Sequence, residues 1–124
     1  MPVEAEEQRV VDNLFKAMQM GPGGEEAMMS LFADDAVFVE TFSGEPKTHE
    51  GFAAIRDAFR ESWKEEPPPD MKLILDRADR DGDRVRADWT CTSPVFPAPM
   101  KGYDLFTIRD GKIARLEVVM LHEE

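Results

Sequence analysis

Residues 31–46, LFADDAVFVETFSGEP, mark the change from helices to strands that decides the fold. Within this stretch, Ala36–Glu40 is aromatic and β-branched, which is typical of a strand. The preceding segment, about Glu25–Phe32, has acidic residues in its first turn and is expected to form a short helix. The following segment, Thr41–Glu50, is polar and contains glycine and proline, which predicts a loop.

Longer helices are expected on both sides of this strand. Glu4–Met20 carries a stripe of apolar residues at helical spacing, as an amphipathic helix does, and the GPGG at 21–24 ends it. Gly51–Glu66 repeats the apolar stripe and ends at the prolines of residues 67–69, which cannot continue a helix.

The second half of the chain predicts antiparallel strands. Arg84–Thr92 alternates apolar and polar residues, the pattern of a strand with one buried face. The pairs Asp81-Gly82 and Asp110-Gly111 suit tight hairpin turns. The expected strands are Met71–Ala78, Arg84–Thr92, Tyr103–Arg109 and Lys112–His122, with the irregular connection Ser93–Met100 between the two hairpins.

Helices followed by a strand meander predict an α+β fold, in which helices cover one face of a curved sheet. A length of 124 residues fits a single domain, since domains average roughly 150 residues. A strongly bent sheet under helices can enclose a conical apolar pocket. We therefore expect a small-molecule site inside the cone.

The chain is acidic, with 15 Lys plus Arg, 26 Asp plus Glu and a formal net charge of −11. This charge repels phosphate backbones and anionic lipids, so we expect no nucleic-acid and no membrane partner. The apolar runs are far shorter than the roughly 20 residues of a membrane span, and MPVEAEEQ at the start lacks a signal-peptide pattern. Cys91 is the only cysteine, which favours a reducing, cytoplasmic location. With one cysteine and two histidines, we expect neither a metal site nor a cofactor.

Two carboxylates are candidates for acid/base chemistry. Glu40 ends the apolar strand and shares a face with Phe38 and Phe42, so it is either a solvent-facing strand end or a general base in an apolar pocket. Asp104 shares a face with Phe106, where it needs a partner or a proton unless it lies on the open rim of the sheet. Two carboxyl groups that meet at one pocket can divide the acid and base roles between them.

The histidines are weaker candidates. His49 lies in THEGFAA, just before the third expected helix, a position that favours a loop or helix-cap histidine over a catalytic one. His122 is near the C-terminus and is expected in solvent. The role of His49 stays open at this point.

The stretch Leu31–Pro46, followed by GFAAIRDAF at Gly51–Phe59, resembles the bacterial ketosteroid isomerases. YDLFTIRDGKI at Tyr103–Ile113 resembles the closing hairpin of the same superfamily, the nuclear-transport-factor-2-like proteins, which also contains the SnoaL-like polyketide cyclases. The resemblance covers nearly the whole chain and implies one SnoaL-like domain over residues 1–124. Its fold would be a cystatin-like cone, a curved mixed or antiparallel sheet wrapped around an N-terminal helix layer, with a deep apolar pocket.

Isomerase chemistry in that family needs a carboxylate base, and a tyrosine plus a protonated aspartic acid that bind the developing oxyanion. The resemblance implies that Glu40 is the base, where the family has aspartate, and that Asp104 is the acid. The two tyrosine positions fall at or near Leu14 and on Phe59, and the only tyrosine in the chain is Tyr103. Loss of one oxyanion donor typically costs ~10²–10³ in rate, so efficient steroid isomerisation is not expected. A related reaction stays open, such as proton transfer beside a carbonyl, dehydration or aldol-type cyclisation.

The same matching implies a pocket lining suited to a flat or bulky apolar molecule, although such side chains are often plain core. The implied lining residues are Leu14, Met18, Phe38, Phe59, Trp63, Trp89, Phe106 and Met120.

Three functions stay open on the sequence alone. The first is a cofactor-independent isomerase, lyase or cyclase with Glu40 as base and Asp104 as acid. The second is a non-catalytic binder of small molecules, which the missing tyrosines favour. The third is a dimerisation module with a vestigial pocket. The resemblance also implies a homodimer, because an open curved sheet leaves one face to cover and relatives use it to pair.

Overall fold

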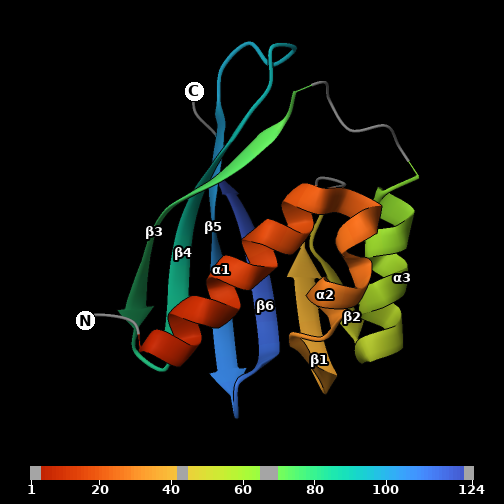
Figure 1. The fold of residues 1–124 in the computed structure, drawn as a ribbon, viewed down its shortest axis with the longest axis vertical. Helices are drawn as coiled ribbons and strands as arrows, with labels where there is room; N and C mark the ends of the chain where they lie inside the picture. The colour runs from red at the N-terminus through yellow and green to blue at the C-terminus, as the bar shows by residue number, and fades with distance from the viewer. Residues whose placement is uncertain (1–3, 42–44, 65–69, 122–124) are drawn as a thin grey trace.

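The protein folds into a six-stranded mixed sheet with helices packed on one face (Figure 1). The computed structural model describes residues 4–41, 45–64 and 70–121, so Phe42, His122 and the prolines at 67–69 lie outside the described residues. The elements, in chain order, are α1 (Ala5–Met20), the 3-10 turn η1 (Gly21–Gly24), α2 (Glu25–Met29), β1 (Phe32–Glu40), β2 (Lys47–Glu50), α3 (Phe52–Ser62), β3 (Lys72–Asp81), β4 (Arg84–Thr92), β5 (Met100–Arg109) and β6 (Lys112–Leu121).

Helix α1 begins and ends close to the expected positions, whereas α2 ends at Met29 and α3 at Ser62, both earlier than expected. At the start of α1, the Glu4 backbone N–H donates to the Glu7 carboxylate at 3.3 Å. The helix ends at Gly21, whose φ of 67° lies in the left-handed region that favours glycine. The next turn packs closely on α1, because a Cβ at Gly24 would lie 2.3 Å from the Ala17 carbonyl oxygen. Glycine therefore lets α2 fold back against α1.

The sheet has the strand order β2-β1-β6-β5-β4-β3. Strands β3 to β6 form the expected antiparallel meander, and β1 joins it parallel to β6. At the β5–β6 turn, Asp110 and Gly111 both have positive φ, 55° and 75°, as a primed hairpin turn requires. Register shifts between Leu75 and Arg77 and between Thr107 and Ile108 mark irregularities of the kind that bend a sheet.

Two expectations about the first half of the chain were wrong in detail. Phe32 is not the end of a helix but the first residue of β1, because it pairs with Ile113 of β6. The segment Thr41–Glu50 is not a loop throughout, since its last four residues form β2. That strand exists because β1 offers a free edge, where His49 pairs with Phe38.

The core lies between the inner face of the sheet and the helices. Its largest fully buried side chains are Leu14 and Met28 from the helical layer, and Phe38, Phe106 and Leu116 from the sheet. Within the described residues, no helix combines the length and the apolar character needed to cross a membrane.

Candidate functional site

The described part of the chain buries three ionisable side chains: Glu7, Glu40 and Asp104, which are 7%, 9% and 3% exposed. Glu7 on α1 lies 2.5 Å from Nη1 of Arg80 on β3, so this carboxylate serves the packing of helix on sheet. The other two are the carboxyl groups that the sequence singles out. Neither faces open solvent at a strand end or on a rim.

Glu40 and Asp104 lie on the same inner face, on either side of β6. Asp104 is opposite Val118 of β6. Since Val39 pairs with Glu117, the next residue, Glu40, is level with Val118. Neighbouring strands lie about 4.8 Å apart, so the backbones that carry the two carboxyl groups are about 10 Å apart. The buried residue Val118 lies between them on β6.

Asp104 is set up to hold a proton near neutral pH. Burial raises its pKa from 3.8 to about 7, because the charged form loses its hydration. The indole Nε1–H of Trp89 donates to Oδ1 of Asp104 at 2.9 Å, which lowers the pKa but by less than burial raises it. Near neutral pH the group can therefore be acid or carboxylate.

Glu40 is held by a histidine that the sequence placed in a loop. Nε2 of His49 on β2 lies 3.2 Å from Oε2 of Glu40. The imidazole also stacks on Phe38, with ring centroids 5.8 Å apart and planes at 28°. With 23% of its side chain exposed, His49 sits at the border between the site and solvent. No sequence signal identifies this contact, because KTHE lacks the apolar alternation that reveals a half-buried strand.

The two positions where the resemblance implies tyrosines are apolar and buried. Leu14 is fully buried, and Phe59 is 5% exposed. Tyr103 cannot replace them, because it alternates with Asp104 along β5 and so faces the other side of the sheet. There the guanidinium of Arg86 lies 3.9 Å from the centre of its ring.

The residues of the implied pocket lining belong to one packed cluster. Leu14, Phe38, Phe59, Trp89 and Phe106 are buried, and Met18, Trp63 and Met120 pack against them partly exposed. A cavity bounded by these residues stays a prediction.

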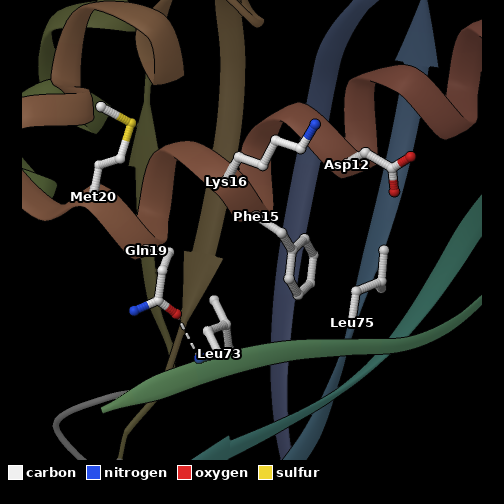
Figure 2. Close-up of a pocket in the computed structure, with 7 residues that line it drawn as sticks. All are labelled: Asp12, Phe15, Lys16, Gln19, Met20, Leu73 and Leu75. Carbon is white, nitrogen blue, oxygen red and sulfur yellow. Dashed lines mark hydrogen bonds between the residues drawn. The ribbon is translucent and has the colours of Figure 1, made fainter. Parts of the chain in front are cut away.

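A groove of about 450 Å³ lies elsewhere, between α1 and the edge strand β3 (Figure 2). It shares no residue with the implied lining, and its walls are Asp12, Phe15, Lys16, Gln19, Met20, Leu73 and Leu75. Gln19 spans the groove to the strand. Its Nε2–H donates to the Met71 carbonyl at 3.0 Å, and its Oε1 accepts from the Leu73 N–H at 2.6 Å.

In residues 4–41, 45–64 and 70–121, no group of three or more His, Cys, Asp or Glu side chains is placed to hold a metal ion. Cys91 is half-buried, and burial raises the pKa of its thiol, which makes it a poor nucleophile. The two carboxyl groups, with His49 and Trp89 as their partners, are what the site can use.

Comparison with known proteins identifies the family and agrees with the fold. The family described as SnoaL-like domain matches residues 11–116. A Sinorhizobium meliloti protein provisionally named a polyketide cyclase is 26% identical, with a TM-score of 0.70 over 89% of this chain and 93% of that one. No curated protein matches the sequence.

Two more distant structures support the fold alone. A Kribbella flavida protein provisionally named a ketosteroid isomerase is 18% identical, with a TM-score of 0.68 over 94% of this chain and 78% of that one. A Methylobium petroleophilum protein of unknown function with a cystatin-like fold is 15% identical, with a TM-score of 0.73 over 99% of this chain and 80% of that one. The expected fold class and the resemblance are thereby confirmed.

Proposed function

Because this chain belongs to the family of SnoaL-like domains, we propose that it carries out acid/base chemistry on a small apolar molecule that contains a carbonyl group. Glu40 is the base and Asp104 the acid. The observation that carries the proposal is the pair of buried carboxyl groups on one face, one of which has a pKa of about 7. A neutral acid beside a carboxylate is what proton transfer at a carbonyl compound needs.

The proposed reaction moves one proton and needs no cofactor. The Glu40 carboxylate removes a proton from the carbon next to the carbonyl, and the electron pair of that C–H bond moves onto the carbonyl oxygen. Protonated Asp104 donates a hydrogen bond to this oxygen as its charge grows. Glu40 then returns the proton to another carbon, or the enolate carbon forms a bond to a second carbonyl carbon within the same molecule and the resulting alkoxide takes up the proton from Glu40.

Catalysis would be modest. A positioned acid/base pair contributes about 10²–10⁴ in rate, and the phenol donors of the family are missing here. This favours a substrate with an acidic C–H bond. A second function is a non-catalytic binder of small apolar molecules. It is supported by the apolar residues Leu14 and Phe59 at the positions where the family has tyrosines.

The test uses a small cyclic β,γ-unsaturated ketone, whose conversion to the conjugated ketone is followed by ultraviolet absorbance. Glu40→Gln should lower the rate by about 10²–10⁴, and Asp104→Asn should lower it as well. The matched control is Glu61→Gln, which removes an exposed carboxylate of α3 that pairs with Lys64. Equal rates in wild type and Glu40→Gln would refute the base assignment. Binding of the ketone without turnover would favour the second function.

A homodimer is proposed as the working form, paired through the outer face of the sheet. That face carries Leu105 on β5, between the ion pair Arg86–Asp88 on β4 and the ion pair Arg115–Glu117 on β6, and it carries Val119 next to Glu117 on β6. These ion pairs carry no net charge, although the chain as a whole carries −11. Two copies of the face could therefore meet without charge repulsion. We expect the protein to act in the cytoplasm, in line with its single cysteine.

A further inference from the structure

Trp89 occupies space that only a glycine leaves open. It pairs with Gly102 across β4 and β5. A Cβ at Gly102 would lie 2.4 Å from Cζ2 of Trp89 and 2.5 Å from the Val119 carbonyl oxygen, closer than real contacts allow. The indole thus lies against the backbone at Gly102. From this position its Nε1–H donates to Oδ1 of Asp104, two residues further along β5.

This contact has a direction. An indole N–H can only donate, so the oxygen that it faces must accept. The carbonyl oxygen of a protonated carboxyl group is a better acceptor than its hydroxyl oxygen, so this contact favours Oδ1 as the carbonyl oxygen and Oδ2 as the oxygen that carries the proton. Of the described residues, Trp89 is the one whose side chain donates a hydrogen bond to the carboxyl group of Asp104.

We propose that Trp89, seated on Gly102, is a positioning residue that fixes the proton of Asp104 on Oδ2 and so presents this acid to a ligand in one orientation. The use of that orientation rests on the proposed function, because a carboxylic acid in a fixed pose matters only if something accepts its proton. The hydrogen bond and the place of the proton are properties of the free protein and can be tested without a substrate.

Among the groups around Asp104, Trp89 is the polar one that acts on its pKa. The residues level with it, Ala87 on β4 and Val118 on β6, do not titrate. Glu40 lies beyond Val118, and it faces His49. Across the core, the buried carboxylate of α1 is Glu7, which is bound to Arg80.

The experiment follows the indole N–H signals of the ¹⁵N-labelled full chain between about pH 5 and about pH 9. The chain has two tryptophans, so Trp63 is a control inside the same molecule. The signal of Trp89 should move with a midpoint of about 7, the pKa of Asp104, and that of Trp63 should not follow this midpoint. In Asp104→Asn the Trp89 signal should stop titrating. A Trp89 signal that stays still while Asp104 titrates would overturn the proposal.

Two variants separate the hydrogen bond from packing. Trp89→Phe keeps an aromatic ring over Gly102 and removes the donor, so the pKa of Asp104 should rise by roughly one to two units. Gly102→Ala should displace the indole and abolish its titration, whereas Gly23→Ala, where a Cβ meets nothing within 4 Å, should not. An unchanged Asp104 titration in Trp89→Phe would contradict the proposal. If a variant fails to fold, the wild-type indole titration still decides.

The indole titration and the ketone assay can fail independently, so the positioning role of Trp89 and the proposed function are tested separately. A Trp89 signal that titrates, combined with no proton transfer to or from the ketone probe, would keep the positioning role and reject catalysis. Turnover that depends on Glu40, combined with a silent indole, would do the reverse.

Discussion

His49 Nε2 lies 3.2 Å from Oε2 of Glu40, and this contact joins an edge strand to the proposed base. The ring of His49 is fixed by its stacking on Phe38. An imidazole held in this way can fix the orientation of the Glu40 carboxyl group.

His49→Phe tests that role, because it keeps the stacking and removes the N–H group. A hydrogen bond of this kind is worth about 1 kcal/mol, so the rate with the ketone probe should fall roughly fivefold. Thr48→Ala, at an exposed neighbouring position, should leave the rate unchanged. Identical rates in His49→Phe and wild type would mean that the contact does not serve the reaction.

Asp104 should make stability fall as pH rises. Its folded pKa of about 7 lies above the usual 3.8, so between these values the folded state binds more protons than the unfolded state. The free energy of unfolding then loses up to about 4 kcal/mol as pH rises through this window, and the loss is complete above the folded pKa. Urea unfolding at several pH values measures the free energy of unfolding of wild type and of Asp104→Asn. The difference between the two proteins should change in this window. Parallel profiles would contradict the burial of a titrating Asp104.

Gln19 should protect the free edge of β3. Its side-chain amide donates to the Met71 carbonyl and accepts from the Leu73 N–H, and Figure 2 shows the second of these hydrogen bonds. Gln19→Ala should cost about 1–2 kcal/mol and speed hydrogen exchange at the Leu73 amide. Gln8→Ala, the same change on the same helix, should leave that amide protected, since Gln8 bonds only to Asp12 in the described residues. Unchanged exchange at Leu73 in Gln19→Ala would show that the edge is protected in another way.

The proposed dimer can be broken from the outer face. Val119→Glu puts an unpaired charge at the centre of that face and should give a species of 14.1 kDa by light scattering at micromolar concentration. Met20→Glu, at a position that is 62% exposed on the helical side, should remain a dimer like the wild type. A wild-type protein of 14.1 kDa would refute the dimer.

The sequence predicted the parts of the fold that depend on local patterns. The helix expected at Glu4–Met20 is present as Ala5–Met20, and the strand Arg84–Thr92 has the expected bounds, because amphipathic stripes and alternation are local signals. Strand β2 could not be foreseen, since its polar residues become a strand only by pairing with β1. The early start of β1 at Phe32 likewise depends on β6.

The site also has a part that local patterns predict and a part that depends on strand pairing. Alternation along β1 and β5 put Glu40 and Asp104 on the face of Phe38 and Phe106, and it left open whether each carboxyl group is buried or faces solvent. The contacts to His49 and Trp89 depend on which strands are neighbours and on their register, and neither can be derived from a single strand. The requirement for glycine at 102 follows from the same cross-strand packing.

The central claim is that Asp104 is a buried acid that shares a site with Glu40. The most direct measurement is a carboxyl-carbon NMR titration of Asp104 in wild type and in Glu40→Gln. We predict a midpoint of about 7 in wild type and a measurable shift in Glu40→Gln. A midpoint near the usual value of ~4 in both proteins would mean that Asp104 faces water, and it would contradict the account.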